Sequence, residues 1–131
     1  MRYLLMIHGN QEVWEGDGLP TWSRDDVKTM IDFMRDLDRE LTDSGELVRA
    51  EGLSGPADAR TVYARPGEEP LVTDGPYAEV KEFLAGFWLV EVPTEQRAFE
   101  IAARISATPG PGGAPVNQPV VVRPIGEPPK V

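Results

Sequence analysis

The residues best suited to chemistry are one short stretch, Asp74–Glu82, and a single histidine far from it in the sequence. The stretch reads Asp-Gly-Pro-Tyr-Ala-Glu-Val-Lys-Glu and joins a tight turn signal to a dense set of ionisable groups. His8 is the only histidine of the chain, and imidazole is the side chain that most readily changes its charge near neutral pH. His8 with Asp74 is therefore the acid–base pair that this sequence could supply.

Each member of this pair also has a structural interpretation. The Asp74 carboxylate could cap the N–H groups of the turn that begins at Tyr77, because Pro76 has no N–H to offer. At the rim of a cavity, the same carboxylate could act as a general base if burial made it more basic. His8 could be a hydrogen-bonded residue at the end of a strand, or a catalyst at the mouth of a cavity.

Several neighbouring side chains could bind a ligand. Glu79 and Lys81 could point into a cavity beside Asp74; the alternative is a solvated loop, or a surface ion pair worth under about 1 kcal/mol. Aromatic side chains could line an apolar pocket, and the candidates are Trp14, Trp22, Tyr77, Tyr63 and Trp88. Trp14 and Trp22 lie in a glycine-containing loop that could act as a lid or could simply be anchored to the rest of the chain.

Composition excludes several classes of function. The net charge is −9, so the basic surface that nucleic acid requires is absent, and an anionic membrane surface is disfavoured for the same reason. The chain has no cysteine, and one histidine with scattered carboxylates gives no recognised metal-ligand spacing. We expect no metal and no cofactor. No apolar run approaches the roughly 20 residues needed to span a bilayer, the first residues do not resemble a signal peptide, and we expect a cytoplasmic protein.

The sequence pattern predicts the elements that would position these residues. Tyr3–Ile7 is a continuous apolar run before His8, which is typical of a buried strand. Ser23 can cap a helix, with Asp26 at the capping-box position, and Gly45 can end that helix in the left-handed conformation. One stripe of this helix is apolar and comprises Val27, Met30, Ile31, Met34, Leu37 and Leu41.

The rest of the chain predicts further strands and one more helix. Thr94 caps that helix, whose inner face carries alanine and isoleucine. A flexible connector rich in proline and glycine follows over residues 109–115. The predicted strands are Leu47–Leu53, a hairpin of Thr61–Arg65 with Leu71–Thr73, the long strand Phe83–Val92, and Val120–Val122.

This order predicts one domain over residues 1–131, with an α+β, ferredoxin-like βαββαβ fold and an extra hairpin. An antiparallel sheet with helices on one face alone should alternate apolar and polar residues. The long strand is apolar on both faces, that of Phe87 and that of Trp88. We therefore expect a second copy to cover the second face, sheet to sheet, around a cavity. The alternative is that the loops at 9–22 and 54–60 cover it.

The chain resembles the YCII-related proteins, in particular the branch named for its Asp-Gly-Pro-Phe motif. The central match is Asp74-Gly75-Pro76-Tyr77, in which Tyr77 replaces the phenylalanine, with Glu79 and Lys81-Glu82 after it. The resemblance covers nearly the whole chain and implies a dimeric α+β barrel. The other matching segments are Tyr3–Ile7, Glu51–Leu53, Ala85–Trp88 and Val121–Pro124.

The resemblance implies two possible functions. Some YCII relatives resemble lyases that act on small unsaturated acids with a histidine–aspartate pair, the histidine lying on the first helix; here Arg24–Asp43 contains none. The first function is thus a small cofactorless enzyme that moves a proton, with His8 or Asp74, on a compact organic acid or an aromatic metabolite. The second is a non-catalytic dimeric module that binds a small molecule or a regulatory partner. It is suggested by analogy, because the Asp-Gly-Pro-Phe branch often resembles accessory proteins associated with sigma-type regulators.

Overall fold

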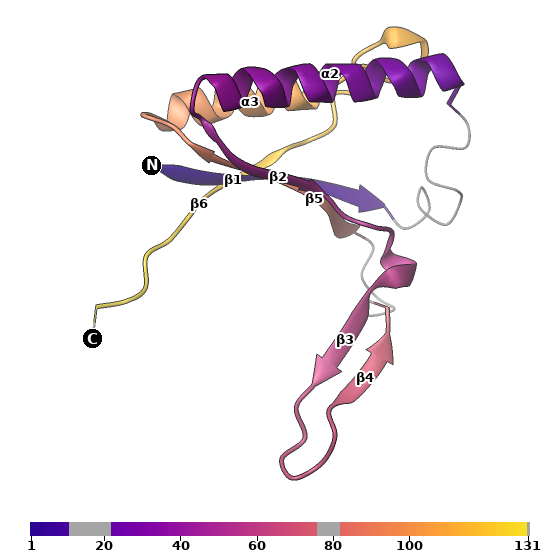
Figure 1. The fold of residues 1–131 in the computed structure, drawn as a ribbon, viewed down its shortest axis with the longest axis vertical. Coiled ribbons are helices and arrows are strands. Elements are labelled where there is room, and N and C mark those ends of the chain that lie inside the picture. The colour runs from indigo at the N-terminus through magenta and orange to yellow at the C-terminus, as the bar shows by residue number, and fades with distance from the viewer. Residues whose placement is uncertain (11–21, 76–81, 131) are drawn as a thin grey trace.

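A computed structural model describes residues 1–10, 22–75 and 82–130 of the chain (Figure 1). Two α-helices and six strands make up most of this part, with two single-turn 3₁₀ helices, η1 and η2. In chain order the elements are β1 (Arg2–Asn10), α2 (Arg24–Asp43), β2 (Leu47–Gly52), η1 (Pro56–Asp58), β3 (Arg60–Tyr63), β4 (Leu71–Asp74), β5 (Glu82–Glu91), α3 (Glu95–Ser106), η2 (Pro111–Gly113) and β6 (Val121–Pro124).

The architecture confirms the predicted α+β, ferredoxin-like fold. Four strands form one sheet in the order β2-β5-β1-β6, and every neighbouring pair is antiparallel. Both α-helices lie on one face of this sheet (Figure 1). The extra hairpin pairs β3 with β4 as a separate two-stranded sheet, which projects on the side away from the helices (Figure 1). None of the described helices is long and apolar enough to cross a membrane.

The core lies between the helices and the sheet. Trp88 is 4% exposed and belongs to this core, so the face of β5 that carries Trp88 is the one that the helices cover. In α2 the buried residues are Leu37 and Leu41, in its second half. Met30 and Met34 of the predicted stripe are only half-buried. The first half of α2 therefore packs less closely on the sheet than its second half.

The predicted helix ends are confirmed. The Ser23 hydroxyl accepts a hydrogen bond from the backbone N–H of Asp26 at 3.1 Å, and the Thr94 hydroxyl caps α3 in the same way. Gly45 follows α2 with a φ of 78°, a left-handed conformation that favours glycine. The Asp26 carboxylate accepts a hydrogen bond from the N–H of Gly112 at 3.1 Å, which ties the start of α2 to the segment after α3.

That segment, expected as a flexible connector, is folded on itself. The N–H of Gly110 donates to the carbonyl of Ala114 at 2.7 Å, and the N–H of Val116 donates to that of Thr108 at 3.0 Å. A side chain on Gly110 would meet the Val116 side chain at 2.7 Å and the Trp22 ring at 3.4 Å. Glycine is thus required here by close packing, and not by chain flexibility.

Two bidentate ion pairs fix α3. The Arg97 guanidinium donates from Nε to Glu46 Oε2 at 2.7 Å and from Nη2 to Glu46 Oε1 at 2.9 Å, and this pair is partly buried. The hydrogen bonds to Arg97 lower the pKa of the Glu46 carboxyl, while the pKa of Arg97 is raised. Arg104 also forms a bidentate pair, donating from Nη1 and Nη2 to the two carboxylate oxygens of Glu40 in α2. These pairs join α3 to α2 and to the start of β2.

The other face of the sheet carries the second apolar surface that the sequence predicted. Cross-strand partners share a face of a sheet, and the pairs Leu4↔Leu89 and Met6↔Phe87 lie opposite the core. All four side chains are half-buried. Of the two loops expected to cover this face, 54–60 is described and lines a small pocket with Phe83 and Leu84 at the start of β5; most of 9–22 lies outside the described residues.

Candidate functional site

A large cavity lies at the end of the sheet where β1 finishes, beneath the middle of α2. Its volume is about 570 Å³, a size typical of small-molecule pockets. Most of its lining is apolar and includes Ile7, Trp22, Met30, Met34, Trp88, Ile105 and Val116. A few polar side chains join them, namely His8, Asp38, Glu51, Ser106, Thr108 and Gln118.

Asp38 is the carboxylate that α2 brings to this cavity. It follows Met34 by four residues, so the helix places the two on the same face. Its Oδ1 accepts a hydrogen bond at 2.9 Å from the indole Nε1–H of Trp88. A buried tryptophan requires such an acceptor for its only polar group, and this bond fixes both side chains at the cavity wall.

The segment that follows α3 supplies the opposite polar wall. The Gln118 side-chain amide donates from Nε2 to the backbone carbonyl of His8 at 2.8 Å, and the Ser106 hydroxyl donates to the carbonyl of Gln118 at 2.7 Å. The Thr108 hydroxyl donates to the carbonyl of Ile105 at 2.6 Å. These bonds hold the end of α3 and the strand end at His8 in one rigid arrangement.

His8 lies at an irregularity of the sheet. The register of β1 and β5 shifts between Ile7 and His8, so that Ile7 lies opposite Gly86, His8 opposite Leu84, and Ala85 has no partner on β1. Bulges of this kind often re-aim a side chain next to a site. The His8 side chain is half-buried and lines the cavity. This position is the one required by the interpretation of His8 as a residue at the mouth of a cavity.

Asp74 has a different environment. Its side chain is 95% exposed, and Oδ1 lies 3.3 Å from Nε of Arg60, its cross-strand partner in the hairpin. Gly75 follows with a φ of 73° and donates its N–H to the carbonyl of Ala59 at 2.7 Å. Asp74 does not line the cavity that contains His8, and no hydrogen bond joins these two described side chains.

The remaining candidate ligand residues divide into two groups. Trp22 is half-buried, lines the large cavity and packs close to Gly110. Trp14, Tyr77, Glu79 and Lys81 lie outside the described residues, so their predicted roles stay predictions. The proposed cap from Asp74 to the turn at Tyr77 falls in the same undescribed stretch.

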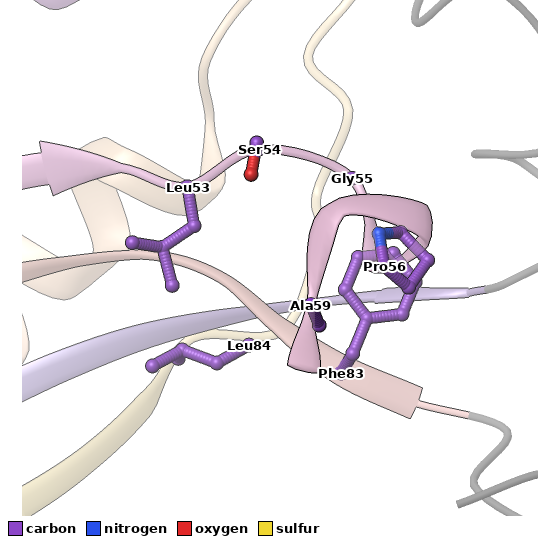
Figure 2. A pocket seen from close by; sticks show the side chains of 7 residues that line it. All are labelled: Leu53, Ser54, Gly55, Pro56, Ala59, Phe83 and Leu84. Atoms are coloured by element: carbon purple, nitrogen blue, oxygen red, sulfur yellow. The ribbon is translucent and has the colours of Figure 1, made fainter. Parts of the chain in front are cut away.

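A smaller cavity of about 290 Å³ lies where β2 leads into η1 and β5 begins. In Figure 2, Leu53 points toward β5 near Leu84, and the rings of Pro56 and Phe83 lie at the other end of the pocket. Ser54 has the only polar side chain among the seven lining residues. This pocket adjoins the root of the hairpin through the bond from Gly75 to Ala59, but it offers little with which to bind or transform a polar molecule.

Sequence reasoning missed the polar wall of the large cavity. Asp38 carried a usable signal, because a carboxylate four residues after Met34 interrupts the apolar stripe of α2. No sequence signal pointed to Gln118, Ser106 or Thr108, since they flank a connector whose folded path follows from long-range hydrogen bonds.

Comparison with known proteins agrees with the fold. Residues 1–114 match the YCII-related domain, and the chain belongs to the YCII-related family. An uncharacterized protein of Rhizobium meliloti (strain 1021) is 28% identical over 125 residues, which cover 95% of this chain and 96% of that protein.

Proposed function

We propose that the chain is a cofactorless small-molecule protein of the YCII-related family, whose large cavity binds a compact metabolite and presents His8 for proton transfer. The observation that carries the proposal is the convergence of His8, Asp38 and Gln118 on one mostly apolar cavity. A mostly apolar lining strengthens each polar contact within the cavity. A single ionisable imidazole at its wall is suited to general acid–base chemistry.

A second candidate is a binding module without catalysis, and Asp74 is the observation that favours it. A catalytic pair would need the Asp74 carboxylate within hydrogen-bond reach of the His8 ring. In the single chain Asp74 is exposed and paired with Arg60. A catalytic role for Asp74 therefore stays a prediction, and the primary proposal assigns the proton transfer to His8 alone.

The open apolar face supports a homodimer as the functional unit. Leu4, Met6, Phe87 and Leu89 form a contiguous apolar surface on the face without helices, and such surfaces are usually covered. A second copy packed sheet to sheet would bury it and form the dimeric α+β barrel. Sedimentation of the wild type should give twice the chain mass of 14.4 kDa, and Phe87→Lys should give the monomer; a monomeric wild type would contradict the dimer.

Two finer assignments belong to the same proposal. We place the chain in the Asp-Gly-Pro-Phe branch, because Asp74-Gly75-Pro76 forms the core of that motif and Gly75 adopts the positive φ that makes glycine necessary there. We also place it in the cytoplasm, since a chain without cysteine suits a reducing compartment.

A metabolite screen tests the main proposal. Thermal shift identifies compounds that stabilise the wild type, and each hit is then measured with His8→Ala and Asp74→Asn. We expect His8→Ala to weaken binding and Asp74→Asn to leave it unchanged. Hits that respond only to Asp74→Asn would contradict the proposal. Mass spectrometry of each hit after incubation separates the two candidates: a product that disappears with His8→Ala identifies an enzyme, and unchanged compound identifies a binding module.

A further inference from the structure

Resting on the proposed function, we infer that the large cavity takes a compact aromatic molecule that carries a basic amine, and that the Asp38 carboxylate is its counter-ion. The inference concerns the charge of the ligand, which neither the fold nor the family determines.

The charges at the cavity wall favour a cation. None of its described lining residues is lysine or arginine, whereas Asp38 and Glu51 are carboxylates. An organic acid would thus enter an apolar cavity without a fixed positive partner, and an unpaired buried charge is strongly disfavoured. The net charge of −9 acts in the same direction, because it attracts cations and repels anions.

Asp38 is the better placed of the two carboxylates. Glu51 Oε1 already lies 3.3 Å from the Nε of Arg49 on the same strand. Asp38 is bonded through Oδ1 to the neutral indole of Trp88, and none of the described cationic side chains forms an ion pair with it. A carboxylate has about four lone-pair sites, so Asp38 can hold Trp88 and still accept a hydrogen bond from an ammonium group.

The apolar walls favour an aromatic ring on that amine. Met30 and Met34 line the cavity two and one helical turns before Asp38, respectively, and thioethers make favourable contacts with aromatic rings. Trp22 lines the same cavity and adds aromatic surface to it. A ring between the methionines would therefore leave its amine within reach of Asp38.

Three probes of one shape and different charge test the inference: 2-phenylethylamine, 2-phenylethanol and 3-phenylpropionate, measured by isothermal titration calorimetry at neutral pH. We expect the amine to bind at least about tenfold more tightly than the acid, a typical effect of one charged hydrogen bond. Asp38→Asn keeps an acceptor for the Trp88 indole and should remove the preference for the amine, with a smaller loss of affinity for the alcohol.

Asp36→Asn is the matched control. It makes the same change of charge on an exposed residue of the same helix, and it should leave the preference for the amine intact. An acid that binds as tightly as the amine, or a preference that survives Asp38→Asn, would overturn the inference. The affinities of the amine and the acid for the wild type test the inference even if Asp38→Asn fails to fold. If none of the three probes binds, the inference is also overturned. The proposed function is tested separately, by the metabolite screen with His8→Ala.

Discussion

The large cavity and the hairpin root at Asp74 differ in how their polar groups are assembled. The hairpin root draws its chemistry from consecutive residues, and the described carboxylate there is exposed and paired with its cross-strand neighbour Arg60. The polar groups of the cavity come from β1, α2, β2 and the segment that runs from the end of α3 to Gln118. Apart from the exposed Glu51, those groups are half-buried among apolar side chains, and hydrogen bonds between elements fix Asp38 and Gln118.

Burial, and not residue type alone, thus sets the environment of an ionisable group. Asp74 on the exposed hairpin stays in contact with water in the single chain, and solvated ion pairs contribute little. Residues from distant elements meet only where the fold encloses them, and enclosure strengthens their interactions. Variants at the two regions should therefore differ in stability and in ligand binding.

Trp88→Ala, which removes an aromatic ring at the wall of the cavity, should have the largest effect on stability. Trp88 is 4% exposed, and truncation of a buried tryptophan to alanine costs about 3–5 kcal/mol of unfolding free energy. Val62 of the hairpin is 61% exposed, so Val62→Ala should change stability by less than about 0.5 kcal/mol. Urea unfolding of both variants measures the contrast. Equal losses would show that the hairpin is as tightly packed as the core.

Gly110→Ala should have the next largest effect. The added methyl group would lie 2.7 Å from Val116 Cγ2 and 3.4 Å from the Trp22 ring, and overpacking of this kind costs about 1–3 kcal/mol. Gly126→Ala is the control, because a methyl group there meets nothing within 4 Å. Denaturant unfolding should separate the two variants. If both behave as the wild type, the segment after α3 is not packed against Trp22.

Glu46→Gln should cost about 1–2 kcal/mol at neutral pH, since it weakens the bidentate bond to Arg97. Because folding lowers the pKa of Glu46 below its ordinary value of 4.5, the stabilisation is complete above that pH and is lost as the pH falls through the lower folded pKa. The difference between wild type and variant should therefore shrink below about pH 4.5. Glu68→Gln, in an exposed 3.8 Å pair with Arg65 of the hairpin loop, should show no such difference.

Asp74→Asn should have the smallest effect. The carboxylate is 95% exposed and its pair with Arg60 is solvated, so the melting temperature should not change measurably. Scanning calorimetry of the variant checks this expectation. A clear loss of stability would reveal that Asp74 holds the turn that follows it, as the capping interpretation predicted.

The sequence predicted the fold better than it predicted the site. Local signals determined the helix ends, as at Ser23 and Gly45, because caps act over one turn. Period-two alternation correctly identified the two faces of β5 from Glu91 back to Gly86. The register shift at Ala85 then places Leu84 opposite His8, and no local pattern announces such a shift.

The cavity could be predicted only in part. His8 and Trp22 were identified by residue type, and both line it. The compact path of residues 109–116 depends on bonds such as Gly112 to Asp26, which are 86 residues apart in sequence. Composition alone suggested flexibility there, since proline and glycine are common to mobile linkers and to tight loops.

Amide and indole ¹H–¹⁵N spectra during titration with 2-phenylethylamine show whether the ligand binds in the cavity beneath α2. Our expectation is that the indole signals of Trp22 and Trp88, assigned from single Trp→Phe variants, shift together with the amides of Gly86 and Gln118, while the amides of Thr73 to Gly75 stay in place. Shifts confined to residues 71–75, with both indole signals unmoved, would contradict it.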